Sequence, residues 1–140
     1  MKKLLPFLLF ALVLLSIPAE AQVRWGVRGG LTDGNPMIGG DVLIPIAGNF
    51  MANPSLEFTT ELFTANADVH YDIDINATSS FWVGAGLAFV NPEDGDYDGG
   101  VNLLGGYGMR RGRWYPYGQV RLTSGGDIDN FTSIHVGVRF

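Results

Sequence analysis

The residues best suited to chemistry in this sequence are arginines and carboxylates that recur at alternate positions of several short segments. They are Arg24, Arg28, Arg121 and Arg139, with Asp41, Glu57, Glu61, Asp72 and Asp74. Alternate residues of a β-strand face the same side of a sheet, so these side chains are predicted to share one face. If that face is enclosed, the charges must pair, because an unpaired buried charge is costly. The set therefore predicts a structural salt-bridge network, or a narrow polar conduit for ions or small solutes.

A second candidate is an acidic segment in which Asp94, Asp96 and Asp98 alternate before Gly99. This spacing matches the first half of a calcium-binding loop, in which alternating carboxylates converge on one hard cation. The position that should supply a bidentate glutamate is Gly105. The segment therefore predicts either an acidic, solvated hairpin tip or a weak Ca²⁺ or Mg²⁺ site, and no confident metal centre.

Catalytic residues are not evident. His70 and His135 are the only histidines, and the chain has no cysteine. A hydrolytic site would need a histidine, a nucleophile and a carboxylate within reach of one another. No motif places such groups together, so we predict no catalytic residue, no cofactor and no enzyme activity.

The chain begins with a predicted secretory signal peptide. Lys2 and Lys3 precede the apolar segment Leu4–Ile17, and Ala19-Glu20-Ala21 is a small-x-small cleavage site. We predict residues 1–21 as the cleaved signal and 22–140 as one domain. The net charge is −5, which makes the chain a poor candidate for binding nucleic acid.

Turn signals divide the remaining chain into eight segments. Each has about the 9–11 residues that a tilted strand needs to cross a bilayer. The predicted strands are Val23–Leu31, Met37–Ile46, Ser55–Thr64, Asp68–Asn76, Ser80–Val90, Gly100–Arg110, Arg113–Thr123 and Phe131–Phe140.

The strand pattern alone fits two opposite arrangements. A soluble β-barrel, such as a lipocalin-like carrier, turns its apolar parity inward, whereas a membrane barrel turns it outward. Aromatic residues favour the second arrangement, because several fall near one end of the predicted barrel, as an interfacial girdle should. These are Trp25, Phe81, Tyr107, Trp114 and Phe140. We therefore predict an all-β fold: an eight-stranded antiparallel transmembrane β-barrel with up-and-down meander topology.

The segment Ser133–Phe140, SIHVGVRF, alternates strictly and ends on an aromatic residue of the apolar parity. It resembles the closing strand of bacterial outer-membrane β-barrels, which typically end in phenylalanine. Together with the signal peptide and the eight segments, it makes the chain similar to the small OmpX-like and OmpA-barrel-like proteins of Gram-negative bacteria.

That resemblance implies an outer-membrane location and a structural role in the envelope. A narrow porin-like channel is the first alternative and a soluble lipocalin-like carrier the second. It also implies that Phe140 is recognised by the outer-membrane assembly machinery. The other partners it implies are outer-membrane lipid and lipopolysaccharide, bound by a monomer.

Overall fold

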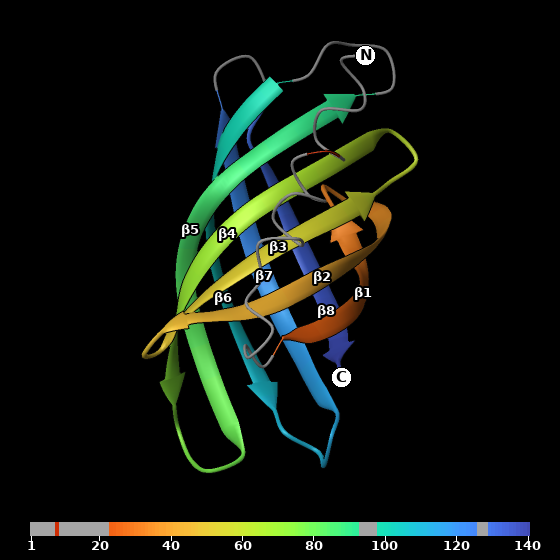
Figure 1. Ribbon diagram of the computed structural model, residues 1–140. Coiled ribbons are helices and arrows are strands. Elements are labelled where there is room, and N and C mark those ends of the chain that lie inside the picture. The colour runs from red at the N-terminus through yellow and green to blue at the C-terminus, as the bar shows by residue number, and fades with distance from the viewer. Residues whose placement is uncertain (1–7, 9–22, 93–97, 126–128) are drawn as a thin grey trace.

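The computed structural model describes Leu8 and residues 23–92, 98–125 and 129–140. Eight antiparallel strands in chain order form a closed barrel, with β1 hydrogen-bonded to β8 (Figure 1). The strands are β1 (Arg24–Thr32), β2 (Asn35–Ala47), β3 (Phe50–Phe58), β4 (Leu62–Asp74), β5 (Ser79–Pro92), β6 (Asp98–Met109), β7 (Tyr115–Gly125) and β8 (Phe131–Arg139). This confirms the predicted eight-stranded meander. Within the described residues, no helix is long and apolar enough to cross a membrane.

The turns distinguish the two ends of the barrel. One end, here called the turn end, carries the β2–β3, β4–β5 and β6–β7 connections together with the start of β1 and the end of β8 (Figure 1). The opposite end, the loop end, carries the β1–β2 turn. There Asp33 and Gly34 have φ of 51° and 84°, as a tight hairpin with two left-handed central residues requires.

The seam between β1 and β8 closes the barrel in the predicted pairing. Gly26 lies opposite Arg139, and Thr32 lies opposite Ser133. Beyond the last pair, the backbones of Trp25 and Phe140 exchange two hydrogen bonds of 3.2 and 2.9 Å. Closure leaves no free sheet edge, which is the condition for a sheet to span a bilayer.

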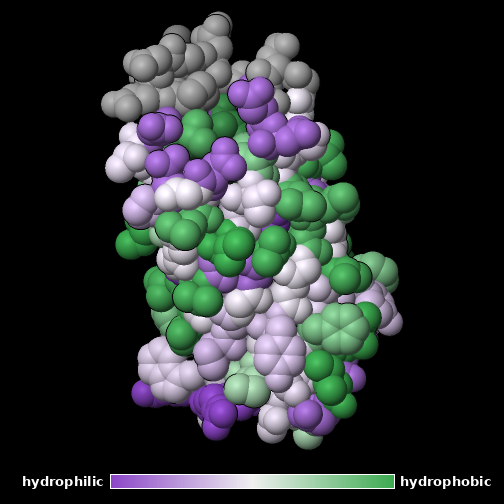
Figure 2. Space-filling view, turned by 180° about the vertical axis from the view of Figure 1, so that it is seen from behind, coloured by the Kyte–Doolittle hydropathy of each residue, from purple (hydrophilic) through white to green (hydrophobic). Residues whose placement is uncertain are grey.

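Apolar side chains face outward and charged side chains face inward. Val136 is 66% exposed on β8, whereas Arg139, which faces inward on the same strand, is 0% exposed. Figure 2 shows hydrophobic residues around the middle of the barrel and hydrophilic residues gathered toward its ends. Val42 and Ile44 share the outward parity of Ile38 and are nevertheless buried. A lipocalin-like carrier would need the opposite arrangement, with its apolar face inward.

The predicted boundaries of the third and fourth strands were wrong. The turn between them lies at residues 59–61, not at Ala65–Ala67, and β3 begins at Phe50 rather than Ser55. Thr59 fixes this turn, because its hydroxyl accepts hydrogen bonds from the backbone N–H groups of Glu61 and Leu62. The error arose because small polar residues that usually mark turns here line the barrel interior.

Several exposed aromatic side chains lie at the turn end. Trp25, Phe81, Tyr107 and Trp114 are all exposed. Phe81 lies opposite Tyr107 in the β5–β6 register, and the Trp114 ring meets the Phe140 ring edge-on at 5.8 Å. At the loop end, Phe58 and Phe63 are in contact with ring centroids 4.9 Å apart.

The outward face predicts the effect of a charge at mid-barrel. Val136→Arg should prevent insertion into lipid vesicles, because a cation facing the bilayer midplane costs about 2–4 kcal/mol. Heat-modifiable gel migration reports the folded barrel, and Val136→Leu is the matched control. Normal assembly of the arginine variant would mean that the faces are assigned backwards.

Candidate functional site

The barrel interior holds a salt-bridge network that crosses the lumen. Glu57 on β3 forms ion pairs with two guanidinium groups, that of Arg28 on β1 and that of Arg121 on β7. Arg28 Nη2 lies 2.8 Å from Glu57 Oε1 as an ion pair, and Arg121 donates a hydrogen bond to the same oxygen. Arg121 also donates to Asp68 Oδ2 on β4 at 2.7 Å. Residues from four strands are thereby joined across the space inside the barrel.

A second pair lies closer to the turn end. Arg139 on β8 donates from Nε and Nη2 to Asp41 Oδ2 on β2, at 3.0 and 2.8 Å. Asn53 and Tyr117 donate further hydrogen bonds to the same carboxylate. The guanidinium of Arg139 also lies 4.0 Å from the centroid of the Tyr117 ring. Asp41 and Arg139 therefore form a buried ion pair, as buried charges require.

Neutral side chains extend the network toward the loop end. Asn102 on β6 donates to Asn66 Oδ1 and Asp68 Oδ1 on β4, at 2.9 and 2.8 Å. Thr123 donates to Asn102 at 2.7 Å, and Asn66 donates to Ser55 at 3.3 Å.

Aromatic side chains fill the lumen nearer the turn end. Trp82, Tyr115 and Tyr117 form a buried cluster with Leu104. Trp82 donates its indole N–H to Gln119 Oε1 at 2.9 Å, and Tyr115 shares a short hydrogen bond with Ser80. The buried tips of these rings therefore have polar partners, as rings that close a lumen require.

Inward-facing glycines explain how these partners meet. Arg139 and Asp41 lie two strands apart, and Gly26 is the β1 residue opposite both. Arg28 and Glu57 likewise flank Gly39 on β2. A Cβ on Gly26 would lie 2.9 Å from Arg139 Cγ, and one on Gly39 would lie 3.1 Å from Glu57 Cγ. The two polar side chains of each pair can therefore meet across the intervening strand only because that strand has a glycine, and so no side chain, between them.

The same relation recurs on the other side of the barrel. Gly86 on β5 lies opposite both Asp68 and Asn102, which are hydrogen-bonded to each other. Gly106 on β6 lies opposite both Trp82 and Gln119, and the indole ring covers it. These glycines are thus structural parts of the network.

The structure divides the predicted charge set into three groups. Five of its members lie in the lumen network: Arg28, Asp41, Glu57, Arg121 and Arg139. Arg24, Asp72 and Asp74 instead line a cavity of about 380 Å³ at the turn end. There Arg24 lies over the Tyr115 ring at 5.3 Å, and Asp72 contacts His70 at 2.7 Å.

Glu61 requires a correction. It lies in the exposed β3–β4 turn rather than in the lumen, because β3 ends at Phe58. Asp68 was missed as a network member for the same reason, since the misplaced turn put it at the end of a strand. The sequence did hold a signal for it: Asp68 lies two residues before His70, so both side chains face the same side of the strand.

The two histidines point inward without a serine partner. In the described part of the chain, His135 Nε2 accepts from Arg28 at 3.0 Å, and His70 Nδ1 contacts Asp72. Ser133 is hydrogen-bonded to Thr32. No nucleophile is therefore paired with a general base among these groups.

The predicted weak cation site lies mostly outside the described residues, which omit Asp94 and Asp96. Asp98 begins β6, and its carboxylate accepts from the Gly99 N–H at 2.8 Å. Elsewhere in the described residues, no group of three histidine, aspartate or glutamate side chains could hold a metal ion.

Comparisons with known proteins identify the fold. No family model and no curated protein matches the sequence. The N-terminal β-barrel domain of Pseudomonas aeruginosa OprF aligns with a TM-score of 0.71 and 15% identity, over 86% of this chain and 100% of that domain. Neisserial surface protein A gives 0.66 and 12%, over 85% of this chain and 94% of its own. The outer membrane enzyme PagL gives 0.57 and 9%, over 84% and 98%. The chain thus has the fold of the small eight-stranded outer-membrane β-barrels.

The network predicts a large effect at its central carboxylate. Glu57→Gln should lower the free energy of unfolding by about 3–5 kcal/mol, because it leaves two buried arginines without a full counter-charge. Urea unfolding of the vesicle-inserted protein measures the loss. Glu61→Gln, the same change in an exposed turn, should leave stability unchanged. Equal losses in both variants would contradict the assigned network.

The glycine positions make a separate prediction on adjacent residues. Gly106→Ala would place a Cβ 2.6 Å from Trp82 Nε1, whereas at Gly105 the nearest atom is 3.6 Å away. Overpacking should cost Gly106→Ala about 1–3 kcal/mol of unfolding free energy. Gly105→Ala should be neutral or stabilising by about 0.4–1 kcal/mol. If urea unfolding showed Gly105→Ala to be less stable than Gly106→Ala, the inward glycine would be dispensable.

Proposed function

We propose that this protein is an integral outer-membrane β-barrel with a structural, non-enzymatic role in the envelope, and that its lumen is closed. The observation that carries the proposal is the joint pairing of Arg28 and Arg121 with Glu57, which ties β1, β3 and β7 together across the lumen. An eight-stranded barrel is only wide enough to be filled by its own side chains. Such an interior supports a rigid membrane-spanning body rather than a transport path.

The exterior supports an outer-membrane location. The outward parity carries exposed apolar residues, including Leu103, Ile134 and Val136, while the charged residues of the strands face inward. The exposed aromatic residues of the turn end are suited to a membrane–water interface, where an apolar ring with a polar edge is most stable.

The interior argues against catalysis. His135 accepts from an arginine, and its Nδ1 atom is buried without a partner. PagL shows that this fold can carry an enzyme, so the fold does not decide the question. Among the described residues, the printed partners of the two histidines are Arg28 and Asp72 rather than a serine hydroxyl, which supports a non-enzymatic role.

A narrow channel is the second candidate. The observation that favours it is the cavity at the turn end, which Arg24, Asp72 and Asp74 line with charge and which is large enough for small polar solutes. Beyond it, a solute would have to pass the buried Trp82 and Tyr117 rings and the Arg139–Asp41 pair.

One experiment separates these functions. Protein expressed in a Gram-negative host should be recovered from the outer-membrane fraction only with detergent, and should give no conductance steps in planar bilayers. The Arg28→Gln variant should give no conductance steps either. Steps from the wild type that change in Arg28→Gln but not in Arg113→Gln would establish a channel instead. A pool soluble without detergent would overturn the membrane location.

The remaining partner proposals concern biogenesis and lipid. Phe140 lies at the barrel rim, exposed and in contact with Trp114, where the assembly machinery could reach it. Outer-membrane lipid and lipopolysaccharide would surround a monomeric barrel.

A further inference from the structure

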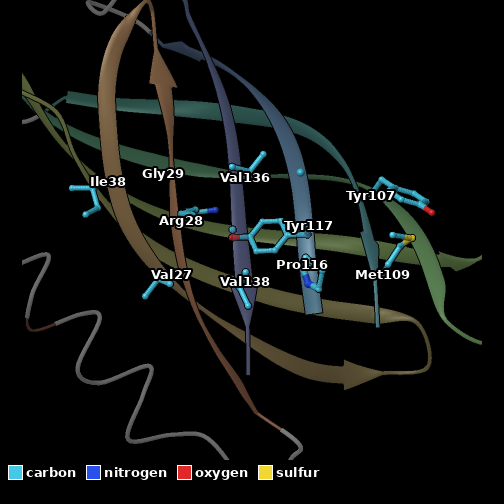
Figure 3. A pocket seen from close by; sticks show the side chains of 12 residues that line it. Val27, Arg28, Gly29, Ile38, Tyr107, Met109, Pro116, Tyr117, Val136 and Val138 are labelled. Atoms are coloured by element: carbon cyan, nitrogen blue, oxygen red, sulfur yellow. The ribbon is translucent and has the colours of Figure 1, made fainter. Parts of the chain in front are cut away.

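The outer wall of the barrel is hollowed over the strands that meet at the seam. A groove of about 760 Å³, here called the wall groove, runs over β1, β8, β7 and β6 (Figure 3). Its volume lies in the range of ligand pockets, which is about 300–1,000 Å³. Apolar side chains line it, and Gly29 and Gly118 form part of its floor. These two glycines lie opposite Val136 from either side, so that Val136 forms a ridge between two gaps.

The barrel itself does not require glycine at these two positions. Neither residue has a positive φ. A Cβ on Gly29 would meet its nearest atom at 3.5 Å, and one on Gly118 at 3.9 Å, which are ordinary van der Waals distances. Glycine also weakens a strand, since it packs nothing and loses more conformational freedom on folding. The inward glycines are explained by the side chains they admit, whereas Gly29 and Gly118 leave gaps on the outer surface on either side of Val136.

A basic turn lies at one end of the wall groove. Met109 and Pro116 line the groove, and the β6–β7 turn between them carries Arg110, Arg111 and Arg113. Arg111 is backbone-paired with Trp114, which continues the β6–β7 ladder beyond the strands. In the described part of the chain, none of these three arginines forms a salt bridge, although the whole protein is acidic.

We propose that the wall groove and the basic turn together bind one anionic glycerophospholipid. One acyl chain lies along the groove over Gly29 and Gly118, and the phosphate is held by Arg111 and Arg113. Guanidinium groups bind phosphate through charge-assisted, often bidentate hydrogen bonds. This rests on the proposed function only in requiring that the barrel spans a membrane.

Charge favours a lipid over a second copy of the chain. Two copies inserted in the same direction and packed groove to groove would bring both basic turns to the same membrane surface. Their arginines would then repel one another, whereas an anionic headgroup neutralises them.

The test uses native mass spectrometry of the full barrel in nanodiscs of phosphatidylcholine with a minority of phosphatidylglycerol. The wild type should retain phosphatidylglycerol roughly fivefold above its bulk fraction. The double variant Arg111→Gln/Arg113→Gln should lose that preference. Gly118→Leu, which fills the groove, should lose the bound lipid. Gly105→Leu adds the same side chain at a wall glycine outside the groove and should behave as wild type.

Each failure has a distinct reading. If the protein shows no heat-modifiable migration, it has not inserted and the proposed function fails. If it inserts but retains both lipids in the bulk ratio, the lipid site is refuted. If Gly118→Leu abolishes a dimer seen in the wild type, without any change in lipid retention, the groove is a contact between copies and the proposal is overturned.

Discussion

The structure depends on one geometric constraint: two side chains on strands separated by a third can meet inside a narrow barrel only if the middle strand presents no side chain between them. Gly26 and Gly39 meet this condition for two of the lumen ion pairs, Arg139 with Asp41 and Arg28 with Glu57. The alternation of large and absent side chains around each level of the barrel is therefore what allows buried charges to be paired. Without those gaps, the arginines would be buried at a cost that no neighbour offsets.

This constraint also separates two uses of glycine in one chain. Inward glycines such as Gly86 and Gly106 accept a neighbour's carboxylate or ring, so an added methyl group has nowhere to go. Gly29 and Gly118 lie on the outer face, where an added Cβ would make only ordinary van der Waals contacts, and they shape the outer surface instead. The positions of the glycines thus determine both which side chains can meet in the interior and the shape of the outer surface.

The two faces of each strand could be separated from the sequence because several charges had to share one parity. The face with Arg28, Glu57 and Arg121 was placed inside because the aromatic residues near one end favoured a membrane barrel. The β3–β4 boundary could not be predicted, since Asn66 and Ser55 have the composition of turn residues but hydrogen-bond to each other inside the lumen. Which inward residues pair with one another could not be predicted either. The pairing depends on the stagger between strands, and the alternation of side chains along one strand does not encode it. The intervening glycines were a usable signal, since each marks where two polar neighbours can meet.

The Arg139–Asp41 pair has a consequence for the order of assembly. Its two residues are separated by 98 positions in the sequence and lie on opposite sides of the seam. Contacts of such high sequence separation form late, because a long segment must first be brought to closure. Until β8 pairs with β1, Asp41 lacks the guanidinium of Arg139, and a slip of one residue would turn Arg139 toward the outer face. The Arg139–Asp41 pair is therefore compatible with only one register of the closing strand.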